Sequence, residues 1–266
     1  MRQSLVALFV AVVLAACGKS HVDEAPSRVP VIPDSITSQL GTVGFAMAVD
    51  LDKIDIAALT VLIPDDPPCI HAVLKTVKVA VLTQSAESWQ AYVTGLGQPL
   101  LRDCVSKFAP MFGGTVADHG SGFELALGDK PAVFTWTGDT ALITEGSNAP
   151  HAGDPPAVIL ELLAKVPRTA KGWLVASGFP KYKIKSATAW METDPTTGWT
   201  FTVIAEASEQ DMAKPWLDSI VTGFTAAARA KGATIDPSWF TVTGTPTTAK
   251  LVATLPPSAF QVSATK

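Results

Sequence analysis

The side chains best suited to catalysis or metal binding are few and scattered in this sequence. The four histidines stand far apart, and none forms the i, i+4 pair of a helical metal site: His21, His71, His119 and His151. We find no nucleophilic-serine motif, no zinc-protease motif and no phosphate-binding glycine loop. We therefore predict no metal, no cofactor and no familiar catalytic centre, and we interpret the histidines as surface residues.

Composition narrows the class of protein further. The chain has 266 residues, of which 47% are hydrophobic, and a formal net charge of −4. This length can bury a substantial core, and the mild negative charge provides no broad basic surface for nucleic acid. Twenty prolines and nineteen glycines favour many turns and short elements over a helical bundle.

The N-terminus has the features of an export signal. Arg2 supplies a positive charge, and the apolar run from Leu5 to Val13 is too short for a stable transmembrane helix. The run ends in Leu14-Ala15-Ala16-Cys17, which closely resembles the lipobox of bacterial lipoproteins. The resemblance covers residues 1–17, and we recognise no family in the rest of the chain. An ordinary secretory signal or an uncleaved anchor would be the alternatives.

The lipobox resemblance implies that residues 1–16 are a signal peptide, cleaved before Cys17. It also implies a diacylglyceryl group on Cys17, usually with an N-acyl chain such as palmitate, and several acyl chains anchor a protein stably. Gly18 is not the aspartate that retains such proteins at the inner membrane, so we expect the outer membrane of a Gram-negative envelope. Residues 17–32 are polar and contain proline, which predicts a flexible tether with a span of about 20 Å.

A hairpin pattern occurs twice in the chain. Lys75–Trp89 reads KTVKVAVLTQSAESW, and Lys185–Trp199 reads KSATAWMETDPTTGW. In both regions apolar residues alternate with period two, which is typical of a strand with one buried face. An amphipathic helix follows each, at Pro99–Phe108 and at Pro215–Phe224. The shared order indicates an internal duplication; chance similarity of two hairpin–helix units is the alternative.

We therefore predict an α+β fold of two tandem duplicated units, each a mainly antiparallel sheet with a helix packed on one face. The first unit covers residues 33–146 and the second covers residues 157–266. Residues 147–156, with the sequence SNAPHAGDPP, form the linker between them. Strands beyond the helices should also correspond, with Phe123 matching Phe240.

The two remaining cysteines, Cys69 and Cys104, are predicted to form a disulfide, because disulfides persist outside the cytoplasm. The bond would close a loop of about 35 residues, worth about 3–4 kcal/mol on the chain-entropy model. Cys104 falls on the apolar stripe of its helix, where the second copy has Ile220, and Cys69 lies in a long loop at 52–70. A redox or metal pair is the alternative, although the chain has no CxxC motif.

Four residues are candidates for surface contact. Lys181, Lys183 and Lys185 alternate with apolar residues, so we expect them on one face of a strand. They would either blunt a sheet edge or contact anionic lipid head groups or polysaccharide. The parity of the second hairpin puts Trp190 on the outer face of the sheet, either partly covered by neighbouring strands or in a binding patch.

The sequence thus predicts a membrane-anchored lipoprotein of the bacterial cell envelope, facing the periplasm or the cell surface. We expect a non-catalytic interaction or assembly module, with the membrane as one partner through Cys17. Another envelope protein or an anionic surface is the second expected partner, and nucleic acid is not. A carrier or sensor of a lipid or other apolar ligand is the alternative, and an enzyme with an unrecognised site is the third.

Overall fold

The structure is a computed structural model that describes residues 44–51, 68–84, 89–127, 131–145, 156–194, 198–230 and 235–256. The signal peptide at 1–16, Cys17, the tether at 17–32 and linker residues 147–155 lie outside these ranges, and the predictions for them remain predictions. The class prediction is confirmed at the level of an α+β fold dominated by antiparallel sheet.

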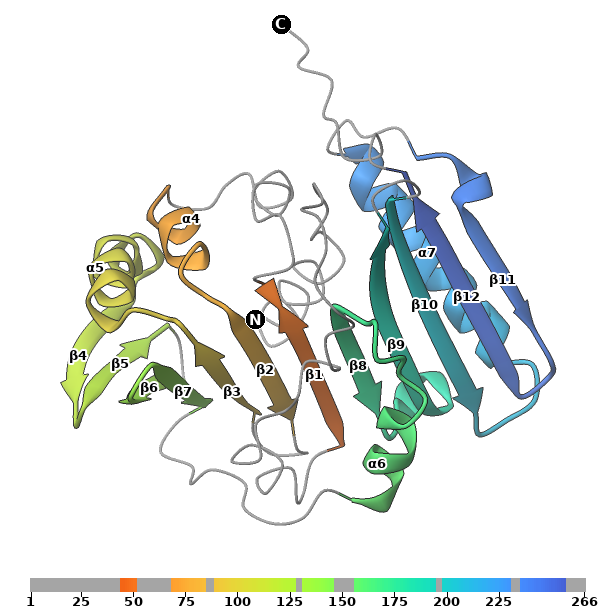
Figure 1. The fold of residues 1–266 in the computed structure, drawn as a ribbon, viewed down its shortest axis with the longest axis horizontal. Helices are drawn as coiled ribbons and strands as arrows, with labels where there is room; N and C mark the ends of the chain where they lie inside the picture. Colours follow the sequence, from red (N-terminus) through yellow and green to blue (C-terminus); the bar gives the residue numbers. More distant parts are fainter. Residues whose placement is uncertain are drawn as a thin grey trace, which may run out of the picture.

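The described strands form one twelve-stranded sheet, in the order β11-β12-β10-β9-β8-β1-β2-β3-β7-β6-β5-β4 (Figure 1). The first half of the chain supplies β1 (Phe45–Asp50), α4 (Pro68–Leu74), β2 (Val79–Gln84), β3 (Trp89–Thr94), α5 (Gln98–Phe108), η2 (Ala109–Phe112), β4 (Thr115–His119), β5 (Gly122–Ala126), β6 (Ala132–Thr137) and β7 (Thr140–Glu145). The second half supplies α6 (Ala157–Leu163), β8 (Gly172–Ala176), η3 (Pro180–Tyr182), β9 (Ile184–Asp194), β10 (Gly198–Ala207), α7 (Ala213–Ala230), η4 (Pro237–Trp239), β11 (Phe240–Gly244) and β12 (Thr248–Leu255).

The two halves of the chain share this sheet. Strand β1 pairs antiparallel with β8, with Phe45 opposite Ala176 and Val49 opposite Gly172. The prediction gave each unit a sheet of its own, and the structure instead joins the strands of both halves across this pair. An unpaired strand exposes a row of backbone donors and acceptors, and pairing β1 with β8 satisfies both rows at once.

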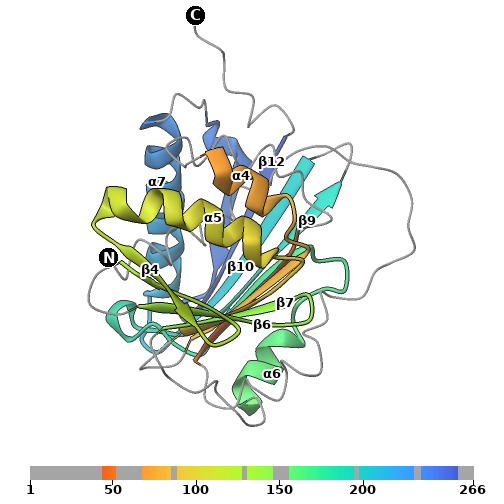
Figure 2. The same ribbon diagram turned by 90° about the vertical axis from the view of Figure 1, so that its left-hand side faces the viewer.

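Helices cover both faces of the sheet (Figure 2). Helices α4, α5 and α7 lie on one face, which we call the α7 face, whereas α6 lies on the opposite face, the α6 face. Ile159 and Leu162 of α6 pack with Trp173 and Val175 of β8, all of them buried. The expectation that helices cover a single sheet face is therefore wrong for α6.

Both predicted hairpins are present, as β2–β3 and β9–β10. Their register puts Val81 opposite Tyr92 on the α6 face, whereas Ala80 and Val93 form a pair on the α7 face. Strand β2 is consequently buried on both faces, and the prediction of one buried face is wrong there. The cause is α6, whose packing against the central strands could not be read from the alternation of residues within β2.

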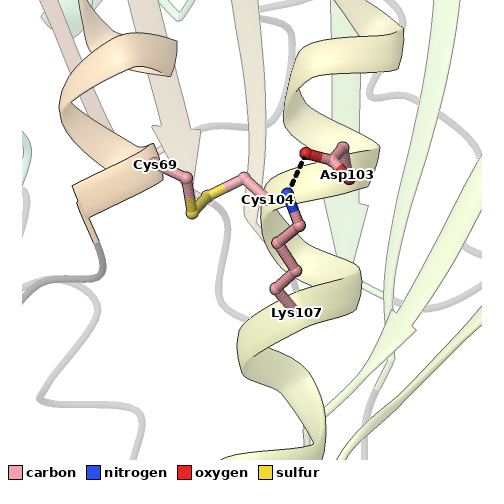
Figure 3. Close-up of a disulfide and its surroundings, with 4 residues drawn as sticks. All are labelled: Cys69, Asp103, Cys104 and Lys107. Carbon is pink, nitrogen blue, oxygen red and sulfur yellow. Dashed lines mark hydrogen bonds and ion pairs between the residues drawn. A yellow bond between two sulfur atoms is a disulfide. The ribbon is translucent and has the colours of Figure 1, made fainter.

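The predicted disulfide between Cys69 and Cys104 is present and joins α4 to α5 (Figure 3). The two Cα atoms are 5.4 Å apart, and Cys104 is fully buried in the core beneath α5. Cys69 belongs to the first turn of α4, not to a loop as predicted. On the exposed side of α5, Lys107 and Asp103 form an i, i+4 ion pair at 2.5 Å.

Candidate interaction site

A groove of about 510 Å³ runs between α7 and the strand β11 at the edge of the sheet. The helix contributes side chains spaced so that they share one face, and the strand side contributes an apolar wall. The lining residues are Lys214, Asp218, Val221, Thr222, Thr225, Ala226 and Arg229 of α7 with Pro237, Phe240 and Val242. The groove is large enough for a small ligand or a short peptide segment.

Strand β11 runs antiparallel to α7 along the groove. Phe240, the first residue of β11, makes an edge-on ring contact with Phe224 in the C-terminal half of α7, at 5.9 Å between centroids. Val242, two residues further on, packs against the cluster that contains Leu217. One end of the groove therefore lies beside the C-terminal turns of α7, and the other lies beside its first turns.

The charges of the groove are unequal at these two ends. Lys214 and Asp218 form an i, i+4 ion pair at 2.7 Å, so their charges largely cancel. Arg229 lies eleven residues beyond Asp218, about 16 Å along the helix axis, and it is exposed. It forms no ion pair with any residue that the structure describes. Among the residues that line the groove, Arg229 is therefore the unpaired charge at this end.

The two edges of the sheet differ in chemistry. Within the described part of the chain, β11 has a strand neighbour on one side, β12, and its five residues contain no charge and no proline. Strand β4, at the opposite edge, carries Asp118 and His119, and Asp118 forms an ion pair with Arg102 at 2.5 Å. Charged side chains discourage the addition of a further strand, so β11 is the more receptive edge.

A second pocket, of about 430 Å³, lies beneath α6 where β9 and β10 meet it. Lys165 and Glu206 form an ion pair there at 2.8 Å. The hydrogen bond from Lys165 lowers the pKa of Glu206, against an opposing effect of partial burial, and the positive charge of Lys185 acts in the same direction as Lys165. Acidic and basic groups thus share this pocket with the apolar side chain of Leu162.

The structure does not arrange the three candidate lysines as predicted. Lys181 lies in the short helix η3, and Lys183 has a positive φ of 57° immediately before β9 begins. Of the three, Lys185 alone belongs to the strand, and β9 is an interior strand, paired with β8 and β10. Lys183 also forms an ion pair with Glu209 at 3.0 Å. The prediction of a lysine-lined edge strand is therefore wrong.

Trp190 lies on the sheet face opposite Met191, as the parity of β9 predicted. That face is covered there: Trp190 pairs across the strands with Trp173 and packs against the cluster beneath α6. Its indole nitrogen donates a hydrogen bond to Glu192 at 3.2 Å. Trp190 is half-buried and belongs to the packing of α6 on the sheet.

The α6 face also carries buried polar groups. The hydroxyls of Thr83, Tyr92 and Thr188 and the indole nitrogen of Trp173 are buried and make no hydrogen bond within the described chain. Burial raises the pKa of Tyr92 to about 12. A buried hydroxyl without a partner costs about 1–3 kcal/mol, so these groups offset part of the stability gained from the apolar contacts of α6.

Of the four histidines, His71 and His119 lie among the residues that the structure describes. His119 is exposed on β4, His71 lies in α4, and His21 and His151 lie outside the described residues. Within the described ranges, His, Cys, Asp and Glu side chains form no group of three or more that could hold a metal ion. No helix in those ranges is both long and apolar enough to span a membrane.

Sequence reasoning did not identify the groove. The uncharged run Phe240–Gly244 was visible in the sequence, but its place at the sheet edge depends on the order of all twelve strands. In the sequence of α7, the residues that line the groove are interspersed with those that pack on the sheet. Their pattern is that of the ordinary polar face of an amphipathic helix.

No protein-family model matches the chain, and no match was found among curated proteins. Solved structures that resemble it include crystal form III of TP0453, with a TM-score of 0.47 and 10% sequence identity, over 92% of this chain and 98% of that one. Crystal form I of TP0453 gives a TM-score of 0.45 and 7% identity, over 84% of this chain and 93% of the other.

Proposed function

We propose that the protein is a membrane-anchored lipoprotein of the bacterial cell envelope that acts as a non-catalytic interaction or assembly module. The support for the anchor is the resemblance of Leu14-Ala15-Ala16-Cys17 to a lipobox, together with the preceding charge and apolar run. Because Gly18 follows the cysteine, the proposed location is the outer membrane if the envelope is Gram-negative. The tether at 17–32 would keep the folded part close to the lipid surface.

The single observation that carries the binding role is the groove between α7 and β11 beside an uncharged sheet edge. Natural proteins usually blunt such edges with charge, proline or a bulge, because an open edge pairs with other chains. Retaining an open edge next to a groove suits a protein whose task is to bind another chain.

The internal duplication forms part of this proposal. In the first half of the chain, β1, β2 and β3 are neighbours in the sheet and are followed by α5. In the second half, β8, β9 and β10 are neighbours and are followed by α7, and both helices lie on the α7 face. The match of Phe123 with Phe240 receives no support from the strand order. Phe123 lies on β5, the third strand beyond β3, whereas Phe240 lies on β11, the second strand beyond β10.

A carrier of an apolar ligand is the second candidate, and the observation that favours it is the pocket beneath α6, with Val158 and Leu162 in its wall. The same wall contains Lys165, Lys185 and Glu206, which a purely apolar ligand would have to desolvate at a cost. This chemistry favours the interaction role.

Replacing Cys17 tests the anchor. The native protein should incorporate labelled palmitate and sediment with membranes, whereas Cys17→Ala should do neither. If Cys17→Ala remains in the membrane fraction after a high-salt wash, the lipid-anchor proposal is wrong, since the tether and domain would then be held by other means.

Photo-crosslinking in intact cells tests the binding role. A photoreactive residue placed at Thr222, which is exposed in the groove, should yield a discrete adduct with another envelope component. The matched control is Thr115, an exposed threonine on the opposite edge strand β4. Equal yields from the two positions, or none from Thr222, would remove the support for the groove as the binding surface.

A further inference from the structure

We propose that the groove binds an extended segment of a partner protein as an additional strand antiparallel to β11, with an acidic side chain of that segment paired with Arg229. This inference rests on the proposed function and names the chemistry of its partner. Its elements are an open strand edge, an apolar wall and a cation at one end of the groove.

The open edge selects an extended polypeptide as the occupant. Strand β11 pairs with β12 in a continuous register from Phe240 opposite Ala253 to Gly244 opposite Ala249, without a bulge. Its outer side has no strand neighbour in the described chain, and Phe240–Gly244 contains neither charge nor proline. Recognition by strand addition takes its affinity from backbone hydrogen bonds along such an edge.

The apolar wall selects the side chains of that segment. Phe240 and Val242 point toward α7 and line the groove, whereas Thr241 and Thr243 are exposed on the other face. Residues that lie opposite each other on neighbouring strands point to the same face of the sheet. Every second residue of an added strand would therefore also lie over the groove, against Val221 and its neighbours. Those positions favour small apolar side chains.

The positive charge of Arg229 favours an acidic side chain in the partner segment and determines where along the segment it lies. Arg229 is the cation of the groove without an ion-pair partner among described residues, and a carboxylate can receive two hydrogen bonds from its guanidinium. Arg229 lies near the Phe240 end of β11. Every strand pair described in this sheet is antiparallel. An added antiparallel strand finishes beside Phe240, so its acidic residue should lie toward its C-terminal end.

Two other occupants fit less well. A second copy of this chain, adding its own β11 antiparallel, would place Gly244 and the uncharged residues 245–247 beside Phe240, and therefore no carboxylate of that strand would reach Arg229. A free carboxyl terminus is usually held by a cluster of backbone N–H groups, whereas the cation here is an exposed side chain on a helix along an open groove. An internal acidic segment is therefore the occupant to which we commit.

Binding of defined peptides to the full-length lipoprotein in detergent tests this inference. The probes are nine-residue peptides, acetylated and amidated, in which valine alternates with serine. One probe carries glutamate in place of the last groove-facing valine, a second carries glutamine there, and a third carries glutamate near the N-terminal end. Affinity is measured by fluorescence anisotropy, and hydrogen exchange of the β11 amides is followed in parallel.

We expect the probe with C-terminal-end glutamate to bind about three- to fivefold more tightly than the other two, the increment of an exposed ion pair. The amides of β11 should exchange more slowly when it is bound. Arg229→Glu should abolish or reverse the preference for glutamate, and Arg229→Gln should abolish it. Arg168→Glu, the same charge change at an exposed site outside the groove, should leave it intact.

Several results would overturn the inference. These are tighter binding with glutamate near the N-terminal end, unchanged exchange of β11, a requirement for a free carboxyl terminus, or protection of β11 by a dimer without peptide. The comparison of glutamate with glutamine peptides uses the native protein, so it holds even if an Arg229 variant is unstable. If adducts still form from Thr222 in cells, the proposed function stands and the acidic-strand inference alone fails; loss of both removes the function as well.

Discussion

The disulfide between Cys69 and Cys104 should supply a large part of the stability of the fold. The bond closes a loop of 35 residues, and the chain-entropy expression for that length gives about 4 kcal/mol at 25 °C. Total stabilities of domains are about 5–15 kcal/mol. Reduction should therefore lower the free energy of unfolding by a substantial fraction without removing a side chain from the core.

Urea unfolding of the purified protein, with and without a phosphine reductant, measures this difference. The double variant Cys69→Ala/Cys104→Ala should lose about 4 kcal/mol through the same entropy. It should lose about 1 kcal/mol more, because Cys104 is fully buried and its truncation leaves a small cavity. The reductant should have no effect on the variant, which is the control.

Hydrogen exchange shows where the bond acts. Helix α4 contributes Val73 to the core, and the disulfide of Cys69 joins it to α5. Reduction should speed exchange of the α4 amides more than that of the neighbouring strand β2. A loss below 1 kcal/mol, or equal acceleration in α4 and β2, would refute the reasoning that the bond pins α4 and constrains the unfolded chain.

Four further substitutions have expected outcomes. Lys165→Met should raise the pKa of Glu206 toward its ordinary value in an NMR titration. Because the pKa of Glu206 is lower in the folded protein than in the unfolded chain, the pair stabilises the fold at pH values above the unfolded-state pKa. This contribution to stability disappears as the pH falls through the folded-state pKa. An unchanged pKa would contradict the pairing. Gly223→Ala should stabilise α7 by about 0.5–1 kcal/mol, since a methyl group there meets nothing within 4 Å. Gly122→Ala should lower the melting temperature, because its Cβ would lie 1.8 Å from a backbone oxygen of β6. Tyr92→Phe should stabilise the protein by about 1 kcal/mol by removing a buried hydroxyl without a partner. It should also abolish the fall in stability from pH 10 toward pH 12 that follows from a folded pKa of about 12; a destabilised Tyr92→Phe would show that the hydroxyl has a partner.

Local patterns predicted the elements well where the governing contacts are near in sequence. The alternation in both hairpins predicted the strand pairs, and the parity of Trp199 and Phe201 placed both residues correctly on one face, the α7 face. The apolar stripe of α5 placed Cys104 in the core. Gly113 ends that helical region with a left-handed φ of 71°, as a glycine after a helix predicts.

Patterns failed where a distant element decides the environment. Alternation within β2 indicated one buried face, but α6, from the other half of the chain, buries the second. The alternation of Lys181, Lys183 and Lys185 resembled a strand, yet η3 and a residue with positive φ interrupt it before β9 begins. Contacts between halves carry no local signal that a single sequence could reveal.

By itself, the sequence determined the α+β class, the two hairpins and the disulfide partners, because each depends on periodicity or on the small number of cysteines. The tertiary structure decided that one sheet crosses both halves, that α6 covers the opposite face, and that β11 lies at the edge beside α7. Strand order depends on which backbone edges meet in space. The same five uncharged residues, Phe240–Gly244, would form an ordinary interior strand if another strand lay beyond them, and they form a candidate binding edge because none does within the described chain.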